Sequence, residues 1–356
     1  MSNNTKNSNT LTKTEPPRLS VSRQLSAITP EKVEWLWPGR IPLGKITLLA
    51  GDPGLGKSIA SIDIAARVST GRTWPDGSEA YTGNVIIISA EDDPGDTIRP
   101  RFDAAEGDPS KVRYLYHVYG KDNEGNKISQ YFDIDNGLAA LEELILSTEA
   151  KLVIIDPISA YMPGVDSNNN SAVRYALTKL AKIAQKNKIA ILVISHLNKG
   201  NDQAQYRVTG SLAFTAVARS VLIIAKDKQN PERRLFLPLK NNLSANTGGM
   251  AYSIDTDSNG IPYISWEQGV VDIDIHEALS PAYSQNRSKV DEAVAWLKSL
   301  LAEGPMDSKE IEKLAREQGV ASKRTLDEAK KVAGITSYTE GSPRHGGKWM
   351  WKLPDT

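Results

Sequence analysis

The sequence predicts an α/β protein in which a mostly parallel sheet is covered by helices, extended by hairpins and followed by a small C-terminal unit. Five short apolar runs recur along the chain: ITLLA, NVIIIS, KLVIID, IAILVIS and SVLIIA. Amphipathic stretches such as SAVRYALTKLAKIAQKN separate several of these runs, which is typical of parallel strands joined by helices. After about residue 235, shorter runs joined by turn signals such as DSNG favour hairpins instead.

Composition divides the chain into four parts. Residues 1–30 are rich in Ser, Asn, Thr and Lys and offer little to bury, so they predict a disordered tail. We expect residues 31–270 to form the α/β domain and residues 271–287 to be a linker. Residues 288–353 then form the separate C-terminal unit.

The overall composition excludes several classes of protein. The 356 residues contain no cysteine, which rules out disulfides, thiolate zinc sites and cysteine nucleophiles. No stretch approaches the roughly 18 consecutive apolar residues of a membrane span, and the first 30 residues lack the apolar core of a secretory signal. We therefore expect a cytoplasmic protein with no membrane partner. A formal net charge of zero argues against a uniformly basic coat for nucleic acid but would hide a local basic stripe.

The first apolar run leads into a glycine-rich loop and then a helix. The residues are Gly51, Asp52, Pro53, Gly54, Leu55, Gly56, Lys57 and Ser58, with Ile59 next in the helix. This order matches G-x-x-x-x-G-K-[ST], in which glycines let backbone N–H groups surround phosphates at a helix N-terminus. Lys57 is expected at the β- and γ-phosphates and Ser58 on Mg²⁺. The motif predicts an ATP site with Mg²⁺.

Two later strands end in carboxylates. KLVIID ends in Asp156, and NVIIIS is followed closely by Glu91, Asp92 and Asp93. Because the carboxyl ends of parallel strands meet at one edge of a sheet, these side chains should lie near the phosphates. We expect Asp156 to hold Mg²⁺ through water and Glu91 to orient or deprotonate the attacking water. The alternative for Glu91 is a solvated strand end, and Asp92 and Asp93 are expected to serve the start of the following helix.

A histidine ends a fourth strand. IAILVIS finishes in Ser195 and is followed by His196, which could sense the γ-phosphate by hydrogen bonding. The alternative is a histidine whose hydrogen bonds are satisfied by the neighbouring backbone.

Four segments together resemble a known family. WLWPGRIPLGKITLLAGDPGLGKS, the AED after the second strand, LVIIDP and LVISHLNKG are similar to the RecA/DnaB-type P-loop ATPases. Within them, the likeness is to the RepA-like hexameric replicative helicases, plasmid and phage proteins of the AAA-ATPase type, and it covers about residues 31–266. The resemblance implies a RecA-like core and a homo-hexameric ring with ATP sites between subunits. It makes Glu91 the catalytic glutamate, Asp156 the Walker B aspartate and His196 the sensor.

The resemblance also suggests an arginine finger. TGSLAFTAVARSVLI is similar to the segment that carries this residue, which would insert Arg219 into the neighbouring subunit's site. The alternatives are an exposed charge at a helix end for Arg219, and Arg207 as the finger. DnaB-type proteins carry a Lys-x-Arg pair on a late strand, whereas this chain reads Lys240, Asn241 and Asn242.

Single-stranded DNA in the ring channel is the partner that the resemblance implies. It would meet the loops after the Asp156 and His196 strands, at residues 161–171 and 198–210. Lys199 and Arg207 could contact phosphates and Tyr206 could stack on a base. The modest charge keeps a mobile surface loop as the alternative.

The C-terminal unit resembles a winged helix. Three helical patterns are followed by ITSYTEGSPRHGGKWMWKLP, which reads as a hairpin with a Gly- and Pro-rich tip. The third helix would bring Lys323 and Arg324 to DNA, and the wing would bring Arg344 and Lys348. A protein-binding module is the alternative.

Together these features predict an ATP-hydrolysing DNA motor of the replicative helicase type. The alternative is a recombination, repair or regulatory ATPase that binds DNA and uses ATP to switch its assembly state without unwinding.

Overall fold

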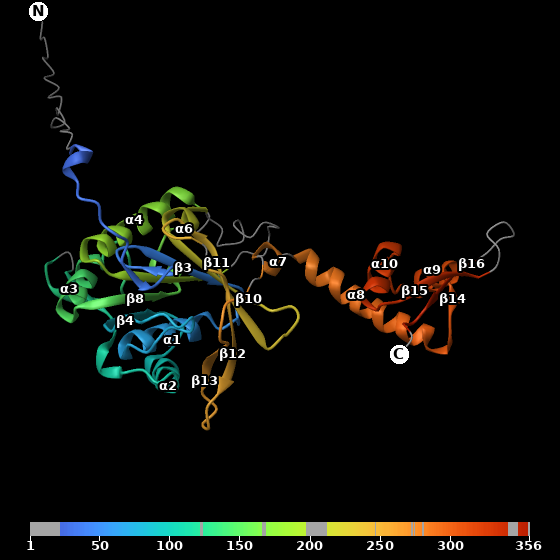
Figure 1. The fold of residues 1–356 in the computed structure, drawn as a ribbon. Coiled ribbons are helices and arrows are strands. Elements are labelled where there is room, and N and C mark those ends of the chain that lie inside the picture. Colours follow the sequence, from blue (N-terminus) through green and yellow to red (C-terminus); the bar gives the residue numbers. More distant parts are fainter. Residues whose placement is uncertain are drawn as a thin grey trace, which may run out of the picture. The chain divides into compact units, whose positions relative to one another are not determined.

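Figure 1 shows the computed structural model of the chain. The structure describes residues 22–121, 124–165, 169–196, 212–245, 247–271, 273, 275–279, 281–340 and 348–354. Four residues predicted to contact nucleic acid lie outside these ranges: Lys199, Tyr206, Arg207 and Arg344. Among the described helices, none combines the length and the apolar character that crossing a membrane requires.

A nine-stranded sheet forms the centre of the protein. In spatial order its strands are β13 (Pro262–Trp266), β12 (Met250–Thr256), β11 (Arg233–Asn241), β10 (Ser220–Lys226), β3 (Ile46–Gly51), β9 (Ala190–His196), β8 (Ala150–Asp156), β4 (Asn84–Ser89) and β5 (Val112–Tyr114). The strands from β10 to β5 pair in parallel, and β11, β12 and β13 continue the sheet in antiparallel pairs. The expected α/β fold with a mostly parallel sheet and C-terminal hairpins is therefore confirmed.

Helices cover both faces of this sheet (Figure 1). One apolar core joins the sheet to α3 (Leu138–Thr148), α4 (Asn170–Asn187) and α6 (Leu212–Val217). The other joins it to α1 (Lys57–Thr70) and α2 (Arg99–Ala104). Along β3, Leu48 belongs to the first core and Leu49 to the second, which is why the strand sequences are continuously apolar.

Local signals set the helix ends. Asn169 caps α4, because its side chain accepts hydrogen bonds from the N–H groups of Ser171 and Ala172. Helix α1 ends at Gly71, whose φ of 75° is left-handed, and its N–H donates to the Arg67 carbonyl.

Short elements complete the domain. They are β1 (Trp35–Trp37), β2 (Ile41–Pro42), η2 (Pro94–Ile98), η3 (Pro109–Lys111), β6 (Val118–Lys121), β7 (Lys127–Gln130) and η4 (Ile158–Tyr161). Residues 1–33 form a unit separate from the rest of the chain. The described part of this unit is exposed and contains η1 (Leu25–Ala27).

The expected linker is largely helical. Within residues 271–287 the structure has α7 (Ile275–Leu279) and the beginning of α8 (Pro281–Leu300). The remaining elements are η5 (Leu301–Glu303), β14 (Met306–Asp307), α9 (Ser308–Glu317), α10 (Lys323–Val332), β15 (Thr336–Glu340) and β16 (Lys348–Lys352).

The C-terminal elements have a core of their own. Leu297, Ile311, Leu326 and Trp351 pack together from α8, α9, α10 and β16. Three strands form an antiparallel sheet in the order β14-β16-β15. Three helices and a small sheet of this kind suit the winged-helix interpretation, which stays a prediction.

Candidate functional site

The predicted site residues follow strands that lie side by side. Spatially, β3, β9, β8 and β4 are consecutive. Gly51 at the end of β3 is in register with His196, and Ser89 at the end of β4 is in register with Asp156. The glycine-rich loop, His196, Asp156 and Glu91 therefore share the carboxyl edge of the sheet, where α/β proteins bind ligands.

The glycine-rich loop joins β3 to α1. Gly51 is the last residue of β3, Asp52, Pro53, Gly54 and Leu55 form the turn, and Gly56 precedes the helix that begins with Lys57, Ser58 and Ile59. Gly54 and Gly56 have φ values of 75° and 85°, a left-handed conformation that other residues rarely adopt. The loop thus has the backbone that its glycines predicted.

Lys57 is held inside the loop. Its side chain is 5% exposed, and its Nζ donates a hydrogen bond to the Asp52 carbonyl at 3.0 Å. Burial lowers the pKa of Lys57, and the negative charges of Asp156, Asp52 and Glu91 oppose this effect. A desolvated ammonium in such a place is positioned to attract a phosphate.

Asp156 is a buried carboxyl group at this edge of the sheet. It is 6% exposed, and its pKa rises to about 6. Burial is the main cause, and the charges of Glu91 and Asp92 add to it, whereas a hydrogen bond from Ser58 and the charge of Lys57 lower the pKa. The Ser58 hydrogen bond and the Lys57 charge thus only partly offset the cost of burying this carboxylate.

The Ser58 and Asp156 oxygens suit Mg²⁺. Within the part of the chain that is described, no three His, Cys, Asp or Glu side chains gather as a metal site. Magnesium commonly takes only one or two protein carboxylates and completes its shell with water and substrate phosphates. A hydroxyl hydrogen-bonded to a buried carboxylate beside a phosphate-binding loop fits this pattern.

Glu91 and His196 lie next to each other. His196 Nε2 is 3.8 Å from the exposed Glu91 carboxylate, and His196 Nδ1 is buried with no hydrogen-bond partner in the described chain. The charge of Glu91 also acts on the pKa values of Lys57 and Asp156. Glu91 therefore belongs electrostatically to the same site, although its part in a reaction stays a prediction.

The two neighbouring acids have other contacts. Asp93 accepts hydrogen bonds from the N–H groups of Gly95 and Asp96 and so caps η2. Asp92 accepts a hydrogen bond from Arg101 at 2.9 Å. Asp93 therefore serves the start of the helical segment, as we expected, whereas Asp92 contacts a side chain within α2.

Arg219 lies at the opposite edge of the sheet. It directly precedes β10, and its N–H donates to the carbonyl of Ile46, the first residue of β3. The loop begins at the other end of β3, five residues or about 17 Å away at 3.3 Å per residue. Arg219 is exposed there, so any contact with an ATP site would be with that of another subunit.

Lys240 supports the helix before Arg219. Its Nζ donates to the carbonyls of Thr215 and Ala218 at 2.5 and 3.0 Å. Burial lowers the pKa of Lys240, and the nearby Arg219 charge adds to this effect. The lysine that the family resemblance singled out thus caps the end of α6.

Residues from the antiparallel strands support the loop, and no local sequence pattern pointed to them. The buried Tyr252 hydroxyl donates to the Leu55 carbonyl at 3.3 Å, and a Cβ on Gly56 would lie 2.7 Å from Ile254 Cδ1. Trp266 Nε1 donates to Asp63 of α1 at 2.8 Å. Strands β12 and β13 therefore hold both the loop and its helix.

The predicted DNA contacts of the C-terminal unit are partly engaged. Lys323 pairs with Glu312 at 3.1 Å, and Lys348 Nζ is 4.0 Å from Asp307. Arg324 is exposed at the start of α10.

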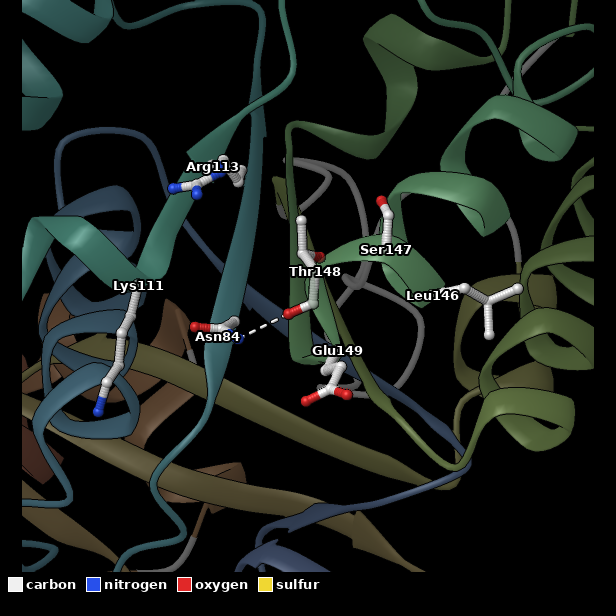
Figure 2. Close-up of a pocket in the computed structure, with 7 residues that line it drawn as sticks. All are labelled: Asn84, Lys111, Arg113, Leu146, Ser147, Thr148 and Glu149. Atoms are coloured by element: carbon white, nitrogen blue, oxygen red, sulfur yellow. Dashed lines mark hydrogen bonds between the residues drawn. The ribbon is translucent and has the colours of Figure 1, made fainter.

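A separate cavity of about 370 Å³ opens at the amino edge of the sheet (Figure 2). Asn84 begins β4 there, and its Nδ2 donates to the carbonyl of Thr148 at the end of α3. The other lining residues are Lys111, Arg113, Leu146, Ser147 and Glu149. None of the predicted site residues lines this cavity, so it is distinct from the carboxyl-edge site.

Comparison with known proteins gives the family. The family model described as "AAA domain" (AAA_25) matches residues 10–202, more than half of the 356 residues. Over 181 residues the chain is 27% identical to the DNA repair protein RadA of Chlamydia pneumoniae, and this match covers 50% of this chain and 34% of that protein. Over 195 residues it is 26% identical to RadA of Listeria monocytogenes, and this match covers 52% of this chain and 36% of that protein.

The chain spans about a third of the length of these relatives. A solved structure, the KaiC-like protein PH0186 of Pyrococcus horikoshii OT3, matches 65% of this chain and 99% of that one, with 16% identity and a TM-score of 0.47. The family match and the strand–loop–helix geometry of residues 46–70 lead to one conclusion. The chain belongs to the AAA domain family and has the strand–loop–helix of a P-loop protein.

Proposed function

We propose that this protein hydrolyses ATP to move on DNA, as a RepA-like replicative helicase that works as a homo-hexameric ring. The observation that carries the proposal is the grouping of Lys57, Asp156 and Glu91 on one sheet edge. There the charge of Glu91 acts on the pKa values of both Lys57 and Asp156, and these two groups act on each other. Such a cluster offers a cation for phosphates, a buried ligand for Mg²⁺ and an exposed base.

The residues have separate parts in the proposed reaction. Backbone N–H groups of the loop and Lys57 bind the β- and γ-phosphates of ATP, and Ser58 and Asp156 hold Mg²⁺, which when bound neutralises phosphate charge. Glu91 accepts a proton from a water molecule as the water oxygen attacks the γ-phosphorus. The bond to the β–γ bridging oxygen breaks, and ADP leaves. His196, 3.8 Å from Glu91, orients that carboxylate or the γ-phosphate.

The position of Arg219 supports the proposed ring. In the proposal this exposed arginine at the amino edge of the sheet acts on a neighbouring subunit, whose carboxyl edge would face it. There it would stabilise the charge that develops on the transferring phosphoryl group, an effect worth roughly 10³–10⁵ in rate.

DNA is the proposed partner for two reasons. The similar RadA proteins are named for DNA repair, and Arg324 is exposed in the first turn of α10. In the ring, Lys199, Tyr206 and Arg207 would meet single-stranded DNA in the channel.

A repair or recombination ATPase without unwinding activity is the second candidate. The RadA relatives favour it, with 27% identity over 50% of this chain in the Chlamydia pneumoniae protein. A strand-displacement assay separates the two: ATP-dependent release of a labelled strand supports the helicase, and DNA-stimulated hydrolysis without release supports the second candidate.

The decisive experiment measures ATP hydrolysis with and without single-stranded DNA. We expect Glu91→Gln to bind ATP normally but to hydrolyse it roughly 10²–10⁴ times more slowly, because the general base is lost. Asp93→Asn is the matched control, since asparagine also caps helices, and should keep the native rate. Hydrolysis by Glu91→Gln at the native rate would remove Glu91 from the reaction.

Arg219→Ala tests the ring. We expect the variant to retain ATP binding and to lose turnover. Mixing it with Lys57→Ala subunits should restore part of the activity, because each variant then supplies what the other lacks. If Arg219→Ala alone hydrolyses ATP at the native rate, Arg219 is not the finger.

A further inference from the structure

The two-stranded ribbon β6–β7 has two different faces. Its register pairs Val118 with Gln130 and Tyr119 with Ser129. Val118 is 5% exposed and packs into the core between the sheet and helices α3 and α4. Because side chains alternate along a strand, the neighbouring positions point outward, and all of those described are exposed: His117, Tyr119, Lys127, Ser129 and Tyr131.

This outward face is aromatic and basic. Tyr119 is 68% exposed and Tyr131 is 80% exposed. The Lys127 ammonium lies 3.8 Å from the centre of the Tyr119 ring, and the rings of His117 and Tyr131 are 4.9 Å apart. Two tyrosines so open to solvent contribute little to the core, so their rings are available to a partner.

The outward face carries one described charge, the Lys127 ammonium, which favours a phosphate, and Glu124 in the turn of the ribbon accepts a hydrogen bond from Asn126 at 3.4 Å. None of its five described positions is a carboxylate. The nearest acids after the ribbon are engaged elsewhere: Asp133 accepts hydrogen bonds from the N–H groups of Asp135 and Asn136, and Asp135 pairs with Lys179 at 2.7 Å. Aromatic rings interleaved with lysine are the surface on which single-stranded nucleic acid stacks its bases.

The ribbon is connected to the ATP-site edge. It follows β5, whose Tyr114 is in register with Ile87 of β4. The Tyr114 hydroxyl donates to the carbonyl of Ser89, the last residue of β4, at 2.8 Å, and the Tyr114 and Tyr116 rings are 4.7 Å apart. Tyr114 and Tyr116, which precede the ribbon, thus connect it through direct contacts to β4, the strand before Glu91.

We propose that the outward face of β6–β7 binds single-stranded DNA, with bases stacked on Tyr119 and Tyr131 and a phosphate at Lys127. The proposal rests on the proposed action on DNA. It adds a contact outside the two loops, residues 161–171 and 198–210, where the family resemblance led us to expect the strand.

Fluorescence anisotropy of a labelled oligothymidylate, measured on the full chain, tests the proposal. Each of Tyr119→Ala and Tyr131→Ala should weaken binding by about 5- to 150-fold, the loss expected when one stacked base loses its ring. Tyr119→Phe keeps the ring and should bind like the native protein. Tyr81→Ala is the matched control. Tyr81 is also an exposed tyrosine, but it precedes β4 at the amino edge of the central sheet, away from the ribbon.

Two further measurements separate bases from phosphates. Lys127→Ala should reduce the slope of log Kd against log salt by about 0.7, the value for one phosphate contact on a single strand. An abasic strand of the same length should bind weakly to the native protein and equally to Tyr119→Ala. Photocrosslinking of 5-iodouracil DNA to the native protein, with the crosslinked peptide spanning Tyr119 or Tyr131, gives a result that needs no variant.

The outcomes are distinct. If the native protein binds the oligonucleotide and both alanine variants bind it equally well, the ribbon proposal fails while the proposed action on DNA stands. If the native protein hydrolyses ATP but does not bind the oligonucleotide, both fail. If the variants keep their DNA affinity but no longer assemble, as sedimentation would report, the face is an interface between copies and the proposal is overturned.

Discussion

Replacing Asp156 by asparagine should stabilise the protein in the absence of nucleotide and Mg²⁺. The pKa of Asp156 rises from its ordinary value of 3.8 to about 6, mainly because the carboxyl group is buried. One pKa unit is worth about 1.36 kcal/mol, so the ionised group destabilises the folded state by about 3 kcal/mol at pH 8. Asparagine has a similar shape and no charge to desolvate.

The effect depends on pH with a definite sign. A carboxyl group whose pKa is raised by folding contributes its stability below about pH 4 and loses it as pH rises through about 6. The advantage of Asp156→Asn over the native chain should therefore grow by about 2 kcal/mol between about pH 4.5 and 8. Urea unfolding of both proteins at the two pH values, without Mg²⁺, measures this difference.

Asp227→Asn is the matched control. Asp227 is also 6% exposed, and burial tends to raise its pKa, but hydrogen bonds from Arg233 and from the N–H groups of Gln229 and Asn230 lower it overall. This variant should be destabilised, by an amount that stays nearly constant over the same pH range.

An Asp156→Asn variant that is no more stable than the native chain at pH 8 would refute this reasoning. So would an advantage that does not change with pH, because the charge of the buried carboxylate would then not be its cause. ATP with Mg²⁺ should stabilise the native chain by mass action and the variant much less, since the ligand carboxylate is gone.

Three further predictions concern the support of the ATP site. Gly56→Ala should lose binding of a fluorescent ATP analogue, because the glycine has a left-handed φ of 85° and a Cβ would lie 2.7 Å from Ile254 Cδ1; normal binding would mean that the loop can shift. Trp266→Phe removes the hydrogen bond to Asp63, and urea unfolding should show a loss of about 1.5–3 kcal/mol; an unchanged midpoint would contradict it. Lys240→Met removes the ammonium that caps α6. Hydrogen exchange of the α6 amides should then become faster, with a loss of about 1 kcal/mol in the free energy of protection, while exchange of the α3 amides stays unchanged.

Much of the central domain could be predicted because its signals are local. Continuous apolar runs such as KLVIID match β8, since a strand buried on both faces needs an apolar side chain at nearly every position. Gly54 and Gly56 of the P-loop have the left-handed backbone conformation that favours glycine. The common carboxyl edge of β3, β4, β8 and β9 also followed, from the single rule that parallel strands share their direction.

The order of the strands could not be predicted in this way. Strands β8 and β9 lie between β3 and β4, although β4 follows the P-loop helix directly in the chain. Pairing between strands depends on long-range packing, and similar apolar runs give no local preference for one neighbour over another. The same limit applies to Arg219, whose place at the far edge follows only from the pairing of β10 with β3.

By itself the sequence determined the chemistry of the ATP site: a phosphate loop with Lys57 and Ser58, and acids that end two buried strands. Spacing within a motif and periodicity within a strand are properties of neighbouring residues, so they can be read without the fold. Only the tertiary structure decided what surrounds that chemistry. Tyr252 reaches Leu55 from 197 residues away, and Tyr119 and Tyr131 face outward together because β6 pairs with β7. Such contacts depend on which segments pack together, and no pattern within either segment encodes them.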